Sequence, residues 1–221
     1  MVASKQASKQ ASINNYLSLL QSLCLKYNVK YLINDYPNSI PYVKLKDVCE
    51  MKRGRTISRK YIADNVGQYP VYSSQTLNDG IIGKINSYDY DGNYVTWTTD
   101  GAYAGTIFHR KGKFSITTHC AVIKSNNNNL LLTDFIGYFL SINTKKLVKG
   151  SSNLMLGIDE ISNIEIPLVP IHIQHHIVQT LDKLSSLINQ TTGLIPSELT
   201  FRTKQYEYYR ELLLNFKKEI D

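Results

Sequence analysis

The C-terminal part of the chain repeats apolar residues at helical spacing. After Pro167 and Pro170 these residues stand four, four, three and four positions apart, at Ile173, Ile177, Leu181, Leu184 and Ile188. The spacing places them on one face of a helix and resembles the seam of a coiled coil. Gly193 and Pro196 interrupt the pattern, which then resumes towards the C-terminus. It predicts two helices, or one kinked helix, over residues 168–221.

A helix of about 20 residues is about 30 Å long, which is more than a small globule needs for its own core. We therefore expect this region to pack against another chain. The residues predicted at that dimer or subunit interface are Ile173, Ile177, Leu181, Leu184, Ile188, Tyr206, Tyr209 and Leu213.

Residues 42–167 have a different pattern, in which short apolar runs alternate with turn-forming residues. Turns are predicted at residues 78–80, 91–93 and 111–113, where Gly follows or separates Asn, Asp or Lys. Strands are predicted at residues 69–73, 94–99, 106–110 and 114–123, and a helix at residues 132–140. This alternation favours an α/β (mixed α+β) globule with many short strands, which the long coiled-coil-like helices then follow.

Residues 1–41 form a third region. The chain begins with a polar stretch in which the tetrapeptide ASKQ occurs twice, at residues 3–6 and 7–10. Because this stretch has nothing apolar to bury, it is interpreted as a polar tail. Apolar residues then recur every three or four positions from residue 13 to about residue 27, which predicts an amphipathic helix.

The chain lacks the features of a membrane or secreted protein. No apolar run reaches the roughly 18–20 residues that a bilayer span requires, and the polar N-terminus has no signal-peptide apolar region. Cys24, Cys49 and Cys120 are far apart and fit neither a zinc spacing nor a disulfide framework. We expect a cytoplasmic protein with buried thiols and no membrane partner.

The positive charge is confined to the middle of the chain. Residues 42–150 contain 15 Lys or Arg and 8 Asp or Glu, which equals the net charge of +7 of the whole sequence. The remaining residues therefore balance to zero. This distribution favours a polyanionic partner for the globule, and nucleic acid is the commonest one.

The motifs of several enzyme classes are missing from the sequence. There is no Asn or Asp followed by two prolines and an aromatic residue, as amino-group DNA methyltransferases need, and no phosphate-binding loop of the Walker type. A nuclease remains an alternative, because Asp35, Glu50 and Lys52 loosely imitate a metal-dependent nuclease site. The segment 49–53, however, shows no convincing strand pattern. A non-catalytic helical assembly protein is a further alternative.

The five histidines point to no metal site. His172, His175 and His176 stand at the start of a predicted helix, where a further ligand would be needed. His109 and His119 are interpreted as ordinary strand residues.

Basic, hydroxyl and amide side chains concentrate around the predicted loops of the globule. Lys and Arg beside such residues suit contacts with phosphates, while Arg, Asn and Gln can read base edges. The candidate DNA-binding residues are Lys52, Arg53, Arg55, Arg59, Lys60, Ser73, Ser74, Gln75, Lys84, Tyr103, Arg110, Lys111, Lys113, Lys149, Ser151, Ser152 and Asn153.

Several segments, taken in order, resemble the specificity (S) subunits of type I restriction–modification systems. They are YVKLKDVCEMKRGR at residues 42–55, YPVYSSQTLNDGIIG at 69–83, VTWTTDGAYAGTIFHRKGKFSIT at 95–117, GSSNLMLGIDEISNIEIPLVP at 150–170, IQHHIVQTLDKL at 173–184 and RTKQYEYYRELLLNF at 202–216. In the first segment, Lys46 and Asp47 stand where the family usually has Gly and Glu.

The resemblance implies a DNA target-recognition domain at about residues 42–167, with conserved helices beside it that act as a spacer and dock other subunits. Such a subunit binds double-stranded DNA and has no catalysis or cofactor of its own. In the family, methylation with S-adenosylmethionine belongs to the modification subunit, and ATP with Mg²⁺ is used by the restriction subunit.

The chain carries a single set of these segments, whereas a full-length S subunit has two. The resemblance therefore implies a half-length form, which we expect to complete the structure as a homodimer. A truncated product that dimerises poorly, or a chain that pairs with another S chain, is an open alternative. A two-fold dimer would read a palindromic split site, with half-sites about one DNA turn apart for a spacer of about 30 Å.

Overall fold

The structure is a computed structural model that describes residues 40–151, 153–190 and 196–215. The chain divides into a unit of residues 1–40 and a unit of residues 41–221, and the elements described below belong to the second. The predicted polar tail and N-terminal helix lie outside the described residues, as does Ser152.

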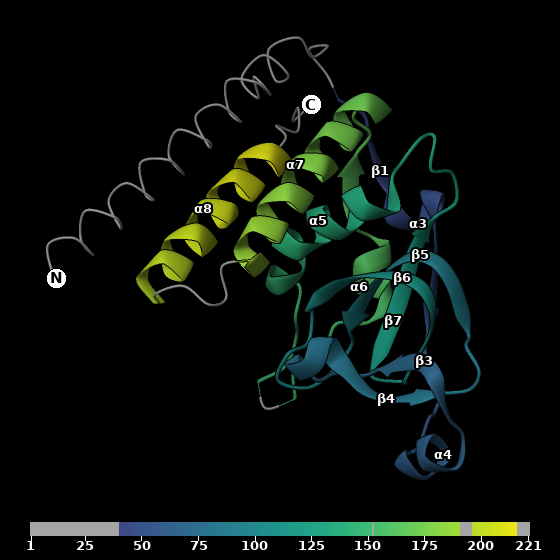
Figure 1. Ribbon diagram of the computed structural model, residues 1–221. Coiled ribbons are helices and arrows are strands. Elements are labelled where there is room, and N and C mark those ends of the chain that lie inside the picture. The colour runs from purple at the N-terminus through teal and green to yellow at the C-terminus, as the bar shows by residue number, and fades with distance from the viewer. Residues whose placement is uncertain (1–39, 152, 191–195, 216–221) are drawn as a thin grey trace, which may run out of the picture. The chain divides into compact units, whose positions relative to one another are not determined.

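Six strands form the main sheet, in the order β2-β7-β5-β6-β3-β4 (Figure 1). Neighbouring strands are antiparallel except β3 and β6, which run parallel. The strands are β2 (Cys49–Arg53), β3 (Val66–Tyr72), β4 (Ile81–Ile85), β5 (Tyr90–Thr98), β6 (Ile107–Ile116) and β7 (Cys120–Ser125). A separate two-stranded sheet pairs β1 (Tyr42–Lys44) with β8 (Glu165–Pro167).

Helix α5 (Thr133–Asn143) covers one face of the main sheet, where it packs on β5, β6 and β7. Phe135, Ile136 and Leu140 of this helix are fully buried, as is Trp97 of β5. The indole Nε1 of Trp97 donates a hydrogen bond to the carbonyl of Leu156 at 3.0 Å. The helical spacing of this segment predicted α5 correctly, and the mixed α/β class is confirmed. The short helices are α3 (Leu45–Val48), α4 (Arg59–Asp64), η1 (Leu77–Gly80), η2 (Thr144–Lys146) and α6 (Ile158–Ser162).

The predicted turns at residues 91–93 and 111–113 are wrong. Both segments lie within strands, and Gly92 of β5 pairs with Gly112 of β6. These glycines have φ angles of 126° and 85°, so the two strands are irregular at the same point and continue past it. The chain reverses instead at residues 99–106. The turn at residues 78–80 is confirmed, with positive φ angles at all three residues.

Three of the four predicted strands coincide with strands of the structure. The predictions at residues 69–73, 94–99 and 106–110 overlap β3, β5 and β6. The predicted strand 114–123 is two strands, because a turn closed by the hydrogen bond from Cys120 N to Thr117 O separates β6 from β7. Residues 49–53, which showed no strand pattern, form β2, since the backbone of β7 pairs with all five.

Two separate helices end the described chain, as predicted: α7 (Ile171–Gln190) and α8 (Pro196–Leu214). They pack against each other and against α5. This chain alone buries Ile173, Ile177, Leu181 and Leu184 of α7 and Leu213 of α8.

We expected this face of α7 to pack against another chain. The burial corrects that expectation, because these α7 residues pack against the rest of their own chain. Tyr206 and Tyr209 are half-buried, and the side chain of Ile188 lies outside the description. A coiled coil between chains stays a prediction. None of the described helices is long and apolar enough to cross a membrane.

Candidate nucleic-acid interface

One end of the main sheet gathers loops that are distant in sequence. Arg53, the last residue of β2, donates from Nε to the carbonyl of Thr118 at 2.8 Å, and the next amide, of Gly54, donates to Cys120 O at 3.0 Å. A side chain at Gly54 would collide with the carbonyl oxygens of Ile116 and Thr117. Glycine therefore allows the segment after β2 to lie directly against the turn between β6 and β7.

A second contact joins this turn to the loop after β3. The Thr117 hydroxyl donates to Ser73 Oγ at 2.9 Å, and the Thr117 amide donates to the carbonyl of Tyr72 at 2.9 Å. Ser73 thereby lies beside the segment that carries Arg53 and Arg55, since Arg55 and Thr117 form a backbone bridge. Two of the predicted clusters are thus brought together.

A groove of about 590 Å³ opens next to Ser73. Four predicted DNA-binding residues line it: Arg59 from α4 and Ser73, Ser74 and Gln75 from the loop after β3. Ser58 holds the start of α4, because its hydroxyl accepts from the Tyr61 amide at 3.0 Å. The Gln75 side chain donates to Ile81 O at 2.5 Å, which closes the loop. One basic and three polar side chains therefore share one hollow surface.

A third pair of loops meets at the same end of the sheet. In the 99–106 loop, Gly101 N donates to Leu154 O at 3.0 Å, and Leu156 N donates to Thr99 O at 2.8 Å. These bonds place the exposed Tyr103 and the exposed residues Lys149, Ser151 and Asn153 on adjoining loops. Lys149 forms an ion pair with Glu160 at 2.9 Å.

We call the joined segments 53–59, 73–80, 99–106, 117–119, 149–151 and 153–155 the loop edge. Figure 1 shows α4, β3 and β4 well apart from α7 and α8. The part of the loop edge next to α4, β3 and β4 therefore lies away from the long helices. Arg55 of the loop edge has partners within the chain: it forms an ion pair with Asp89 at 3.0 Å, and its guanidinium lies 5.3 Å from the ring centre of Tyr61.

Arg110 does not belong to this exposed set, and its assignment to DNA binding is wrong. The residue is 3% exposed. Its guanidinium donates to Asp79 Oδ2 at 2.5 Å and to the Asp79 carbonyl at 2.8 Å, and it lies 3.6 Å from the ring centre of Tyr72. Arg110 points to the side of β6 on which the ring of Tyr72 and the turn of η1 lie, so it holds the turn at residues 78–80.

The other basic candidates are exposed but are dispersed over several elements. Lys111 and Lys113 lie on β6 rather than on a turn. Lys111 is 3.9 Å from Asp134, and the ammonium of Lys113 lies 4.6 Å from the ring centre of Tyr88. A hydrogen bond with that tyrosine raises the pKa of Lys113. Lys52 on β2, Lys60 on α4 and Lys84 on β4 are exposed at separate positions.

Sequence reasoning missed one pair at the loop edge. His119, interpreted as an ordinary strand residue, has 54% of its side chain exposed, and its Nδ1 lies 2.6 Å from Asp100 Oδ2. The two residues belong to different loops. Their separation of 19 positions matches no motif, so no sequence signal could have paired them.

The geometry gives the nuclease alternative no support. Glu50 lies on β2 opposite Lys124, while Asp35 is outside the described residues. No group of three or more His, Cys, Asp or Glu side chains in the described part of the chain could hold a metal ion.

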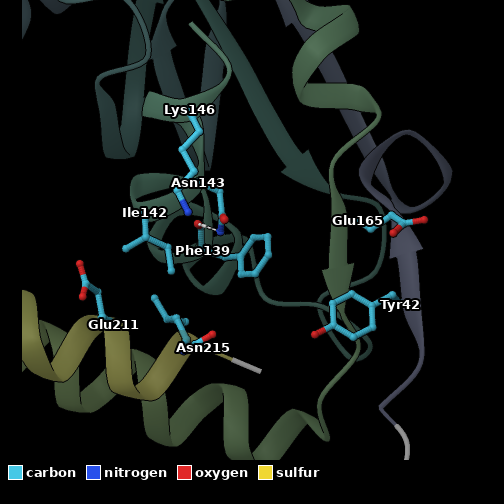
Figure 2. Close-up of a pocket in the computed structure, with 9 residues that line it drawn as sticks. Tyr42, Phe139, Ile142, Asn143, Lys146, Glu165, Glu211 and Asn215 are labelled. Carbon is cyan, nitrogen blue, oxygen red and sulfur yellow. Dashed lines mark hydrogen bonds between the residues drawn. The ribbon is translucent and has the colours of Figure 1, made fainter. Parts of the chain in front are cut away.

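A second hollow, of about 510 Å³, lies between α5, η2, the two-stranded sheet and α8 (Figure 2). Its lining includes Phe139 and Asn143, which are joined by a hydrogen bond from Asn143 Nδ2 to Phe139 O at 2.9 Å, together with Glu165 and Glu211. None of the predicted DNA-binding residues lines this hollow. It is therefore separate from the loop edge.

Residues 37–200 match the family model of the type I restriction modification DNA specificity domain. Over 195 residues the chain is 41% identical to S.MpnORF285P of Mycoplasma pneumoniae, which is described as a type I specificity subunit, with 84% of this chain and 64% of that protein covered. It is 39% identical to the type I restriction enzyme MpnII specificity subunit of the same organism, with 86% and 59% covered.

The fold is also found among solved structures. The HsdS subunit from Thermoanaerobacter tengcongensis superposes with a TM-score of 0.60 at 15% identity, over 95% of this chain and 54% of that chain. This chain thus spans less than two thirds of the length of each of the three proteins. The match of the family model to most of the chain and the identity to the two relatives lead to one conclusion: the chain belongs to the type I restriction–modification DNA specificity domain family.

Proposed function

We propose that this chain binds double-stranded DNA through the loop edge and recognises one half of a split target there. The observation that carries the proposal is the groove lined by Arg59, Ser73, Ser74 and Gln75. Arg binds phosphates and reads guanine, and serine and glutamine donate to phosphates or read base edges. The excess positive charge of residues 42–150 supports the same surface.

We further propose that the chain docks the modification and restriction subunits of a type I complex and performs no catalysis itself. In this proposal S-adenosylmethionine is used by the modification subunit, and ATP with Mg²⁺ by the restriction subunit. The long helices α7 and α8 are the proposed docking region, because they lie apart from the loop edge and α8 exposes Tyr208 and Leu212. The cytoplasm is the proposed location, where the DNA and these subunits are found.

The DNA-binding proposal is tested by selecting bound duplexes from a randomised library with the full chain, alone and with its modification subunit. Enrichment of a common half-site is the expected result. Recovery of unenriched sequences from both samples would contradict sequence recognition.

A matched pair of variants tests the groove itself. We expect Arg59→Gln to weaken duplex binding and to lower the slope of log K against log salt by about 0.9, the value for one lost phosphate contact. Lys145→Gln, an exposed basic residue of η2, should leave the slope unchanged. Equal slopes for the two variants, measured by fluorescence anisotropy, would remove the groove from the interface.

A further inference from the structure

The side chain of Asp100 orients His119, and Thr99, directly after the buried end of β5, in turn orients Asp100. The Asp100 side chain faces His119 with Oδ2, while its Oδ1 accepts from the Thr99 hydroxyl at 2.8 Å. Thr99 is buried, and its amide donates to the carbonyl of His119 at 2.9 Å. With Nδ1 directed at Asp100, Nε2 is the ring nitrogen left for another partner.

Arg53 binds the backbone next to this imidazole. Its Nε donates to the carbonyl of Thr118, the residue before His119. The guanidinium is exposed, and this bond leaves its two terminal nitrogens for another acceptor. Arg53 is therefore bonded to the peptide unit that joins Thr118 to His119.

Two further basic side chains of the globule have acidic partners within the chain. Lys149 is paired with Glu160 at 2.9 Å, and Arg110 is paired with Asp79. Burial, helped by the charge of Asp100 and opposed by Arg110, raises the pKa of Cys120 to about 12, so this thiol stays neutral. Asp100 is the charged group that contacts the imidazole.

We infer that Arg53 and His119 together bind one phosphate of the DNA duplex, and that His119 does so in its protonated form, so that binding takes up a proton. The inference rests on the proposed function, because it takes the loop edge as the duplex-binding surface. A neutral imidazole with its Nδ1–H donated to Asp100 presents a lone pair at Nε2, which repels a phosphate oxygen. Protonation converts Nε2 into a donor for that oxygen.

A phosphate contact can be measured without knowing the target sequence, because phosphates are the same in every duplex. The probe is a fluorescently labelled duplex of mixed sequence, titrated with the full chain over a range of salt concentrations at about pH 6 and about pH 8, on either side of the usual histidine transition. For the unmodified chain we expect the slope of log K against log salt to be steeper at the lower pH by up to about 0.9, the value for one phosphate.

Two substitutions of His119 should each make the slope independent of pH, one at a shallow value and the other at a steep value. His119→Gln cannot become charged, so its slope should be equally shallow at both pH values. His119→Lys is charged at both, so its slope should be equally steep at both. His175→Gln, an exposed histidine of α7, is the matched control and should behave like the unmodified chain.

Asp100→Asn tests the positioning role of the carboxylate. The amide oxygen can still accept from Thr99, but the imidazole loses its anionic partner, so the pH-dependent part of the slope should shrink. Arg53→Gln should lower the slope at both pH values.

If the unmodified chain and His119→Gln respond to pH in the same way, the inference is wrong while duplex binding stands. If the unmodified chain binds no duplex at either pH, the proposed function itself fails. A loss confined to one selected sequence, with no change on the mixed-sequence duplex, would assign His119 to a base and overturn the phosphate contact.

Discussion

At the scale of single residues, Arg110 links three parts of the globule through its buried guanidinium. It lies between the rings of Tyr72 and Phe108, at 3.6 and 4.4 Å from their centres, and binds both the side chain and the backbone of Asp79. Asp79 has a φ angle of 54°, a conformation that L-residues rarely adopt. Arg110 therefore stabilises an unfavourable turn that borders the proposed DNA groove.

Replacing Arg110 by Met should lower the free energy of unfolding by about 2–3 kcal/mol, through lost charged hydrogen bonds and cation–π contacts. The loss stays below that of a doubly buried ion pair, because Asp79 is 63% exposed and remains solvated. Urea denaturation measures it. Lys111→Met, on the exposed side of the same strand, is the control and should change stability by about 0.5 kcal/mol or less; equal losses would contradict the buried role.

Asp134 at the start of α5 is the acceptor of a small polar cluster under the helix. His109 Nδ1 lies 3.1 Å from Oδ1, and Asn93 donates to Oδ2 at 2.8 Å. Burial by itself raises the pKa of Asp134, but these hydrogen bonds and the charges of His109 and Lys111 outweigh it, and the pKa lies below its ordinary value. The folded state therefore binds the proton more weakly than the unfolded state does.

Because the pKa is lower in the folded state, the stability that Asp134 contributes is complete above the unfolded value of about 3.9. It is lost as the pH falls through the depressed folded value. We expect Asp134→Asn to be less stable than the unmodified chain by about 1.5 kcal/mol at neutral pH, with the difference shrinking below about pH 4. Denaturation curves of both proteins across this range measure it; a difference that is constant with pH would contradict the charge effect.

At the scale of elements, Gln174 fixes α7 to the globule. Its side chain is fully buried. Oε1 accepts from the Leu132 amide at 2.8 Å, and Nε2 donates to the carbonyls of Leu130 and Val169 at 2.9 and 2.8 Å. One side chain thus satisfies three backbone groups, at the starts of α5 and α7 and in the loop before α5. A second contact, from Tyr138 of α5 to Asp182 of α7 at 2.5 Å, joins the same two helices.

Gln174→Glu should therefore cost about 3 kcal/mol or more, because a buried carboxylate cannot donate to the two carbonyls and is placed against them. The matched control is Gln179→Glu, an exposed position on the same helix. Thermal or urea denaturation of the two variants measures the difference. Similar stabilities would show that Gln174 does not hold α7 in place.

At the scale of the whole unit of residues 41–221, a basic, loop-rich end of a sheet is separate from a region of long helices. If two copies associate, each contributes one such loop edge, and a two-fold axis makes the recognised site palindromic. The buried seam of α7 means that this association has to use other surfaces of the helices, such as the side of α8 that exposes Tyr208 and Leu212.

We expect light scattering of the full chain, alone or with its modification subunit, to give twice the chain mass for the specificity component. Leu212→Glu should lower that mass, since a charge on an apolar contact opposes association. Leu77→Glu, an exposed apolar residue of η1, controls for the added charge. A single-chain mass under all conditions would remove the dimer and leave the DNA-binding proposal intact.

Much of this organisation follows from the sequence alone. Apolar spacing predicted α5, α7 and α8, because an amphipathic helix needs nothing beyond its own period to be recognised. The ordered segments from residue 42 to residue 216 predicted the family, and the charge distribution placed the basic excess in the globule. Each of these properties is local, or is a sum over local properties.

The tertiary structure decided what covers each face and which loops meet. Arg110 and Lys111 are adjacent in sequence, yet the first is buried and the second exposed, because their side chains point to opposite faces of β6 and only that of Arg110 is covered, by Tyr72 and Asp79. The residues around Gly92 and Gly112 predicted turns from the sequence, but in the structure the two glycines pair with each other on neighbouring strands. Asp100 with His119, and Gln174 with Leu132, are brought together by strand order and helix packing. A periodic pattern shows that a face is apolar, but only long-range packing determines its partner.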